Sequence, residues 1–235
     1  MAGSADAKVV MVSGGGRGLG AAITQRLLDD GWTVSLGLRD VSQAEAFSGA
    51  LSAHAFDATD PPTAAAWMDG TIARHGRIDA LVNNAGILRM VDFDQGDEDD
   101  LDAMWAINVK APFRVLKAAL PHLRKGGQGR VVNIASTDGK RFRGGTSVGY
   151  SMTKHAVLAL TQAVRQAAYD DGVRATAICP GAINTELLAG LPAVTPKTDR
   201  LSPDTVADMV AAVLALPNQA SVPEIVMNTR LETII

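Results

Sequence analysis

Two side chains in the second half of the chain, Tyr150 and Lys154, have the types and the spacing that proton transfer requires. Residues four apart on a helix project from one face about a turn apart, so the ammonium would lie beside the phenol. A neighbouring cation stabilises phenolate, and we therefore expect Lys154 to lower the pKa of Tyr150 towards neutrality. Such a phenol can act as an acid or a base. With Asn108 and Ser136 ahead of it in the chain, the pair predicts hydride-transfer chemistry.

A glycine-rich turn near the start of the chain, Ser13–Gly20, predicts a dinucleotide site. Glycines at 14, 18 and 20 allow a tight turn, bring backbone amides close to a pyrophosphate and let the next helix pack on the sheet. The N-terminus of that helix favours the phosphate charge. The spacing differs from the general Gly-x-Gly-x-x-Gly fingerprint. No Gly-Lys-Ser/Thr follows it, which disfavours an ATP-binding loop.

The composition favours one domain over residues 1–235, with 47% apolar residues and no segment that resembles a linker. A formal net charge of −3 provides no basic surface for nucleic acid, so small molecules are the expected partners. Cys179 is the only cysteine, which excludes an internal disulfide. The histidines lack metal-ligand spacing, and we expect no metal. The chain has no signal-like start and no apolar run of about 18 residues, so we expect a cytoplasmic protein without a membrane partner.

Short apolar runs rich in β-branched residues alternate with longer stretches of helical period. This alternation predicts an α/β fold with about seven parallel strands in one doubly wound sheet and helices on both faces. The expected strands are Val9–Val12, Thr33–Leu38, Ala53–Phe56, Ala80–Val82, Arg130–Ala135, Arg174–Ile178 and Glu224–Met227. The expected helices are Ala21–Asp30, Gln43–Ser52, Thr63–His75, Glu98–Leu123, Gly149–Tyr169 and Asp204–Ala215. Ligands bind beyond the carboxyl ends of such strands, where one cleft can collect every motif.

Four segments together resemble the short-chain dehydrogenase/reductase family over nearly the whole chain. They are Ser13–Gly20, Asn83-Asn-Ala-Gly86, Tyr150-x-x-x-Lys154 and Pro180-Gly181. The resemblance implies a single Rossmann-type domain and an oxidoreductase. Such an enzyme transfers a hydride between a nicotinamide cofactor and a ketone, an aldehyde or a secondary alcohol.

The resemblance also implies a role for each catalytic candidate. Tyr150 exchanges a proton with the substrate oxygen, which Ser136 holds. Lys154 additionally hydrogen-bonds the nicotinamide ribose, and Asn108 kinks a helix and holds a water that links the lysine to solvent. Without the resemblance, Asn108 would be a polar residue satisfied inside a helix.

Most of the expected cofactor contacts are also carried over from the family. Asp57 would receive the adenine amino group, although an Asp after a strand is usually a turn residue. Asn83 is the expected contact of its segment in the adenosine pocket, and Thr185 would meet the carboxamide or the phosphates. The full set is Gly14, Arg17, Gly18, Leu19, Gly20, Arg39, Asp57, Ala58, Asn83, Ala85, Gly86, Tyr150, Lys154, Pro180, Gly181, Ile183 and Thr185.

The end of the second expected strand favours NADP over NAD. An acid there accepts hydrogen bonds from the ribose hydroxyls, whereas an arginine accommodates a 2′-phosphate. By resemblance Leu38 takes the position of the acid and Arg39 the phosphate side, and Arg17 can approach the same phosphate. Asp40 leaves an alternative open, because a shift of one residue would put a carboxylate near the ribose.

The serine of the catalytic set has a competitor. The family usually places it thirteen residues before the tyrosine, the position of Thr137, whereas Ser136 lies fourteen before. We prefer Ser136, since the strand that ends at Ala135 aligns through it and an extra residue fits the irregular segment Lys140–Ser147. A hydroxyl at Thr137 could substitute chemically.

Two other functions compete with an oxidoreductase. Gly145-Thr-Ser-Val-Gly149 matches the nucleophile motif of serine hydrolases, but no strand leads into Ser147, and only His155 follows it, with no intervening acid. The second alternative keeps the fold and the NADP(H) site without catalysis, as a nucleotide-responsive regulator. The intact catalytic set argues against it.

Substrate identity should depend on three irregular segments, Leu88–Asp94, Lys140–Ser147 and Asn184–Arg200. Arg89, Lys140, Arg141 and Arg143 lie in the first two, where they either favour an anionic substrate or are solvated loop charges. An NADP preference would favour reduction. By family analogy we expect a homotetramer or a dimer through Glu98–Leu123 and Gly149–Tyr169.

Overall fold

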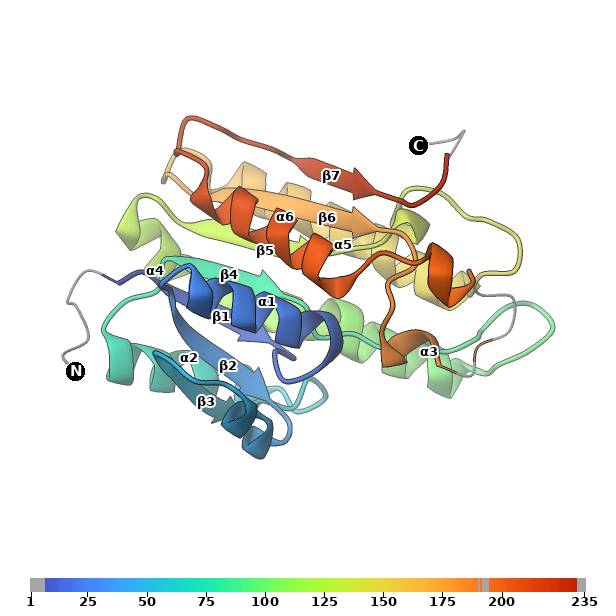
Figure 1. Cartoon of the computed structure of the whole chain (residues 1–235), viewed down its shortest axis with the longest axis horizontal. Helices are drawn as coiled ribbons and strands as arrows, with labels where there is room; N and C mark the ends of the chain where they lie inside the picture. Colours follow the sequence, from blue (N-terminus) through green and yellow to red (C-terminus); the bar gives the residue numbers. More distant parts are fainter. Residues whose placement is uncertain (1–6, 190, 192–194, 232–235) are drawn as a thin grey trace.

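The computed structural model describes residues 7–189, 191 and 195–231, and its centre is one parallel sheet (Figure 1). The strands are β1 (Val9–Ser13), β2 (Thr33–Leu38), β3 (Leu51–Ala55), β4 (Ala80–Asn83), β5 (Arg130–Ile134), β6 (Arg174–Pro180) and β7 (Glu224–Met227). Their order across the sheet is β3-β2-β1-β4-β5-β6-β7, and every pairing is parallel. The predicted seven-stranded Rossmann-type sheet is therefore confirmed.

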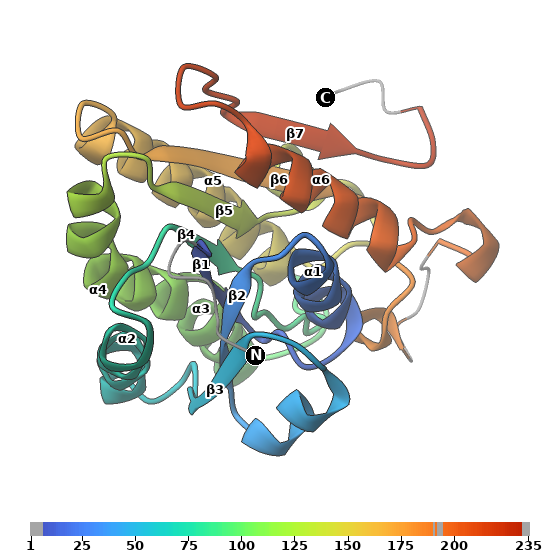
Figure 2. The same cartoon turned by 60° about the vertical axis from the view of Figure 1, so that its left-hand side comes forward.

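Helices cover both faces of the sheet (Figures 1 and 2). The α-helices are α1 (Gly18–Asp29), α2 (Pro62–His75), α3 (Glu98–Trp105), α4 (Ala111–Gly126), α5 (Val148–Ala168) and α6 (Pro203–Ala215). Helices α1 and α6 pack together on one face, while α2, α4 and α5 lie on the other. Shorter helical segments are η1 (Val41–Ala46), the π-helix η2 (Ala106–Lys110), η3 (Thr137–Gly139), η4 (Glu186–Leu188) and η5 (Lys197–Asp199).

The central strands are mostly apolar because both of their faces are buried. Side chains alternate between the faces, so Val10 and Val12 of β1 pack with Ile23 of α1 on one side. Met11, between them, packs with Trp67 of α2 on the other. These opposed cores hold the sheet rigid and fix the edge from which the site projects.

The chain reverses its direction across the sheet after β3. Strands β1 to β3 extend one way from the centre, and β4 starts again on the other side of β1. The loops that leave β1 and β4 therefore diverge at their carboxyl ends, which creates a crevice at this switch point. The glycine turn follows β1, and the Asn83–Gly86 segment begins at the end of β4.

Two of the expected helices differ in the structure. Residues 43–52 were expected to be helical, but η1 ends at Ala46 and β3 begins at Leu51, where it pairs with Val34 of β2. Asp40 caps the start of η1 by accepting a hydrogen bond from the Ser42 amide, and the pairing of β3 with β2 requires extended backbone from Leu51 onward. The long helix expected for Glu98–Leu123 is divided by η2 into α3 and α4.

Candidate active site

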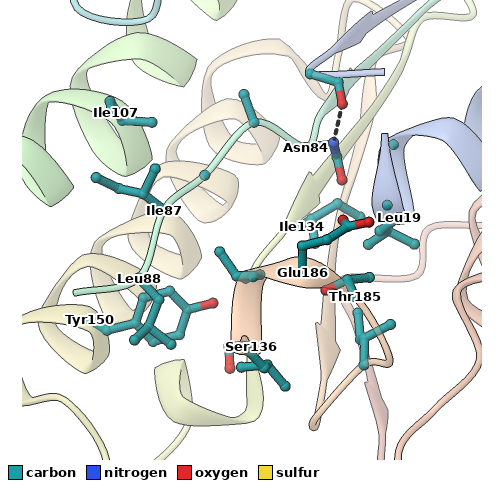
Figure 3. A pocket seen from close by; sticks show the side chains of 18 of the residues that line it. Leu19, Asn84, Ile87, Leu88, Ile107, Ile134, Ser136, Tyr150, Thr185 and Glu186 are labelled. Carbon is teal, nitrogen blue, oxygen red and sulfur yellow. Dashed lines mark hydrogen bonds between the residues drawn. The ribbon is translucent and has the colours of Figure 1, made fainter. Parts of the chain in front are cut away.

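A cleft of about 620 Å³ opens at the carboxyl edge of the sheet. Its walls come from the loops after β1, β2, β3, β4, β5 and β6, together with the start of α5. Figure 3 shows the Tyr150 hydroxyl directed into this pocket, with Ser136 on the same side and Thr185 and Glu186 nearer to Leu19. The edge predicted from the sequence thus holds one continuous cavity.

The glycine turn forms one wall of the cleft in a shape that only glycine fits. Gly18 has φ +53°, a left-handed conformation, and a Cβ on Gly20 would lie 2.0 Å from the Gly14 carbonyl oxygen. Helix α1 starts here with no side-chain cap and no acid in its first turn, so its first amide groups are not occupied by a side chain. This arrangement fits a pyrophosphate.

Asn84 fixes the glycine turn to the loop after β4. Its side-chain amide donates to the carbonyl oxygens of Ser13 and Gly14, each at 3.1 Å. The hydroxyl of Ser13 in turn accepts from the backbone amides of Asn84 and Ala85 at 3.0 and 3.1 Å. These four bonds make the end of β1 and the Asn83–Gly86 segment one unit. Asn84 was not predicted as a site residue, although its place inside the Asn83–Gly86 motif was a signal.

The part of the cleft formed by the glycine turn and the loop after β2 contains both predicted arginines. Arg17 and Arg39 are exposed and line the cleft. The neighbouring acid is already in use, because Asp40 accepts hydrogen bonds from the amide and hydroxyl of Ser42 at 3.1 and 2.7 Å, which lowers the pKa of that carboxyl. Asp57 also lines the cleft and accepts from the amide and hydroxyl of Thr59, and these bonds, with the nearby Arg39 charge, lower its pKa.

Tyr150 stands at the reacting end, in the first turn of α5. Its backbone amide donates to the hydroxyl of Ser147, the N-cap of this helix, at 3.1 Å. The Ser147 hydroxyl also exchanges hydrogen bonds with the backbone of Val91, and its side chain is buried. Ser147 is therefore engaged as a structural cap, which gives no support to its use as a hydrolase nucleophile.

The pKa of Tyr150 is shifted in the direction opposite to the one expected. Burial raises it first of all, because the ring is only 8% exposed, and the Asp138 charge raises it further. Hydrogen bonding by the Ser136 side chain lowers it, without reversing the shift. The expectation that Lys154 brings this pKa towards neutrality was wrong for the protein without cofactor. The phenol stays protonated at neutral pH.

Lys154 lies behind the phenol, one turn along α5. Its ammonium donates to the Ile134 carbonyl oxygen at 2.8 Å and lies over the Tyr150 ring, 5.4 Å from the ring centre. Burial lowers the pKa of Lys154 to about 8, while Cys179 and Asp138 oppose that shift. The i, i+4 spacing does bring the two side chains together, but the contact is between the ammonium and the face of the phenol ring.

Ser136 is placed better than Thr137 for work at the phenol. Both residues line the cleft after β5. The Ser136 hydroxyl caps η3 by accepting from the Asp138 amide at 3.0 Å, and it also acts on the pKa of Tyr150. Thr137 is buried like Ser136, its carbonyl oxygen accepts from Arg141, and its side chain is not among the causes of the Tyr150 pKa shift. The geometry favours Ser136 as the hydroxyl that faces the reacting group.

Two predicted residues, Asn83 and Asn108, are absent from the cleft wall. They line a small second cavity of about 10 Å³ that also touches Lys154, close to the space one water needs. Asn108 lies in the π-helix, as its expected helix distortion requires. Its side-chain oxygen accepts from the Ile87 backbone amide, and its side-chain nitrogen donates to the Ile87 carbonyl oxygen, each at 2.9 Å. Asn83 donates to Asn133 at 2.8 Å, and its own side-chain oxygen has no partner in the described part of the chain.

The loop after β6 crosses the cleft opposite the catalytic side chains. Ile183 forms an isolated bridge with Leu201, which anchors the start of this loop. Thr185 and Glu186 reach across to the glycine turn, each 3.5 Å from the point where a Cβ on Gly18 would lie. Thr185 thus lies beside the glycine turn, and its expected contact with the phosphates stays a prediction. Glu186 was missed by the sequence analysis, since nothing local predicts an acid there.

The remaining predicted cofactor contacts all line this cleft. They are Gly14, Arg17, Gly18, Leu19, Gly20, Arg39, Asp57, Ala58, Ala85, Gly86, Tyr150, Lys154, Pro180, Gly181, Ile183 and Thr185. Across residues 7–189, 191 and 195–231 no group of three potential metal-ligating side chains is found. Over the same residues, every helix is too short or too polar to cross a lipid bilayer.

Comparison with known proteins agrees with this geometry. The sequence model of the family described as short chain dehydrogenase matches residues 8–194. Agropine synthesis reductase of Rhizobium rhizogenes is 40% identical over 220 residues, which are 92% of this chain and 51% of that protein. The chain therefore spans about half the length of this curated relative.

Two solved structures share the fold over almost their entire length. An alcohol dehydrogenase from Thermococcus sibiricus, complexed with 5-hydroxy-NADP, is 28% identical with a TM-score of 0.88, covering 97% of this chain and 100% of that one. A gluconate 5-dehydrogenase from Burkholderia cenocepacia, in complex with NADP and tartrate, is 26% identical with a TM-score of 0.86, covering 95% and 94%. The chain belongs to the short-chain dehydrogenase family.

Proposed function

We propose that this protein is an NADP-dependent oxidoreductase that reduces a ketone or an aldehyde to an alcohol. The observation that carries the proposal is the convergence of Tyr150, Ser136 and Lys154 at one end of a cleft whose other end is a glycine turn. The reverse reaction, oxidation of a secondary alcohol, uses the same groups.

Three features support NADP as the cofactor. The uncapped start of α1 and the tight glycine turn fit a pyrophosphate. Arg39 lines the adenosine end, and the Asp40 carboxylate, which would favour a free ribose hydroxyl, is bound to Ser42. Solved relatives that contain NADP or a derivative of it share the fold. Arg39, assisted by Arg17, would hold the 2′-phosphate.

The residues at the reacting end divide the remaining work. The cofactor supplies the hydride when it is bound. Tyr150 gives its proton to the carbonyl oxygen, and its raised pKa favours this direction because the phenol is protonated at neutral pH. Ser136 donates a hydrogen bond to the same oxygen as negative charge develops on it. Lys154 places a positive charge below the phenol and would bind the nicotinamide ribose.

Asn108 and Asn83 act on this chemistry indirectly, through neighbouring residues. Asn108 holds the backbone of Ile87, which lines the cleft beside Gly86. A water in the second cavity would connect Lys154 to solvent between these asparagines. In this proposal Asn83 supports the lysine and does not contact the cofactor.

The decisive test is NADPH consumption with a broad panel of ketones and aldehydes, measured on the parent protein and on Tyr150→Phe. Loss of general acid catalysis should reduce kcat by about a hundredfold to ten-thousandfold. The dissociation constant of NADPH, measured by fluorescence titration, should stay close to the parent value. Tyr169→Phe is the matched control, because Tyr169 is the other tyrosine and lies on the surface at the end of α5.

Tyr150→Phe with activity close to the parent would contradict the mechanism. NADPH binding by a parent protein that reduces nothing in the panel would favour the alternative, a catalytically silent regulator on the same fold. Ester hydrolysis abolished by Ser147→Ala would instead revive the hydrolase.

We also propose a homotetramer or a homodimer formed through α4 and α5. Phe113 on α4 and Met152 on α5 are 55% and 47% exposed in the single chain, although both are large and apolar. Light scattering should give two or four times the chain mass of 24.5 kDa. A mass of one chain at micromolar concentration would contradict this assembly. A cytoplasmic location remains part of the proposal.

A further inference from the structure

Four basic side chains flank the reacting end of the cleft, and three of them are neutralised. Arg89 forms an ion pair with Asp100 at 3.7 Å. Lys140 forms one with Glu224. Arg141 is buried against Asp138 at 2.9 Å and also donates to the Thr137 carbonyl oxygen at 3.1 Å. Their charges serve the fold and are not available to a substrate.

Arg143, the fourth, differs from the others in both position and pairing. It lines the cleft, whereas Arg89, Lys140 and Arg141 do not. Within the described part of the chain, its guanidinium has no hydrogen bond or ion pair, and the side chain is half-buried. Arg230 also lines the cleft but has interactions of its own. A half-buried cation without a counter-ion at a ligand site can bind an anionic group of the ligand.

The backbone around Arg143 ties this side chain to the catalytic tyrosine. The Arg143 carbonyl oxygen accepts from both the amide and the hydroxyl of Thr146, at 3.2 and 2.7 Å, and closes a turn. Ser147 follows directly and caps α5 at the amide of Tyr150. The eight residues from Arg143 to Tyr150 therefore belong to one hydrogen-bonded unit, with both ends on the cleft wall.

Several apolar side chains also line the cleft. Leu88 and Met90 come from the loop after β4, and Leu187, Leu188 and Leu191 from the segment after β6. Figure 3 shows Leu88 and Tyr150 among the side chains that line this pocket. A substrate in this space meets leucine and methionine side chains, polar groups such as Thr146, the Asp138 carboxylate that pairs with Arg141, and one unpaired cation, Arg143.

We propose that Arg143 binds a carboxylate of the substrate, so that the preferred substrates are oxo acids. This assignment rests on the proposed function. The product is the corresponding hydroxy acid, formed from one hydride of NADPH and one proton of Tyr150. A planar guanidinium pairs with a planar carboxylate through two parallel hydrogen bonds, and one cation balances one negative charge. A phosphate dianion would need further cations, which here are already paired.

The test compares acids with their uncharged esters. NADPH consumption is measured with acetoacetate, levulinate and benzoylformate, and with the methyl ester of each. The parent should prefer the acids in kcat/KM by about tenfold to a hundredfold, the worth of a hydrogen-bonded charge pair. Arg143→Gln should remove the preference by lowering kcat/KM for the acids alone. Arg143→Lys should keep part of it, because lysine retains the charge without the planar fork.

Arg89→Gln is the matched control, since it removes a paired arginine outside the cleft wall. It should keep the parent preference within about twofold. A parent that reduces esters as well as acids, or an Arg143→Gln protein that loses both equally, would overturn the carboxylate assignment and leave the reductase intact. A parent that reduces none of the six compounds, nor any ketone or aldehyde of the wider panel, would overturn the proposed function and this inference with it.

Discussion

The two ends of the cleft are constructed differently. At the cofactor end the main chain forms the site: the glycine turn offers amide groups, and Asn84 fixes it through bonds to the Ser13 and Gly14 carbonyl oxygens. At the reacting end the site consists of side chains. Tyr150 and Lys154 project from α5, and their protonation depends on burial and on nearby charges.

This difference separates two kinds of substitution. A change at the cofactor end should alter how tightly the dinucleotide binds, because backbone and phosphate contacts are made equally before and during the reaction. A change at the reacting end should alter kcat, because its hydrogen bonds strengthen only as charge develops on the substrate oxygen. Measured kinetic constants can therefore show whether the cleft really has two independent ends.

Ser136→Ala should have the largest effect among the tests of this separation. Removing one donor to a developing oxyanion costs about a hundredfold to a thousandfold in kcat. The dissociation constant of NADPH should not change, since Ser136 belongs to the reacting end. Steady-state kinetics with the best ketone, together with a fluorescence titration of NADPH, would measure both.

Thr137→Val is the matched comparison, because Thr137 is the next hydroxyl along the chain and also lines the cleft. It should retain most of the activity. If Thr137→Val lost the activity and Ser136→Ala kept it, the assignment of the two hydroxyls would have to be exchanged. Weaker NADPH binding by Ser136→Ala would instead deny that the two ends are separate.

The fold was readable from the sequence where its signals are local or repeated. Strands β2 and β7 have the predicted bounds. For β2 the reason is its burial between two layers, which favours a largely apolar run. Residues 43–52 were predicted wrongly, because their pattern allowed a helix. Pairing of β3 with β2 decides the outcome there, and such pairing is a tertiary effect that no local pattern contains.

The candidate site could be predicted from the sequence to a similar extent. Glycine spacing and an i, i+4 pair are local, and both lie in the cleft as expected. The direction of the Tyr150 pKa shift was not readable, because it depends on burial and on Asp138. Asn83 was assigned to the cofactor, but at the end of β4 it is the next residue, Asn84, that faces the cleft. Glu186 reaches the glycine turn only through the tertiary fold.

Arg39→Asp tests the cofactor end and should have the second largest effect. Loss of a charge-assisted hydrogen bond should raise the KM for NADPH by about tenfold to a hundredfold. The KM for NADH should change far less, because NADH has no 2′-phosphate, and kcat at saturating NADPH should remain near the parent value. The ratio of kcat/KM values for the two cofactors is the measurement.

Lys8→Asp controls for the change in net charge. Lys8 is exposed and precedes β1, at the edge of the sheet opposite the cleft. It should leave the cofactor ratio unchanged. Equal use of NADPH and NADH by the parent, or an Arg39→Asp protein whose kcat falls while both KM values stay constant, would contradict the division of the cleft.

The smallest effect concerns Lys154, which connects the two ends and has a pKa of about 8. Its ammonium is required in the proposal, so kcat/KM should fall above this pH, by about tenfold for each further pH unit. The stability of the folded protein should change in the opposite direction and increase with pH. Lysine in the unfolded chain keeps its proton up to about pH 10.5. Between pH 8 and that value the unfolded state therefore binds more protons, and the free energy of unfolding rises with pH.

These opposite slopes distinguish lysine titration from alkaline unfolding, which would remove activity and stability together. Activity and urea unfolding should be followed over the same pH range. In Lys154→Arg the charge persists at every accessible pH, so the fall in kcat/KM near pH 8 should disappear from whatever activity remains. A parent profile that stays flat to pH 10, or a Lys154→Arg profile with the parent inflection, would show that this ammonium does not link the ends of the cleft.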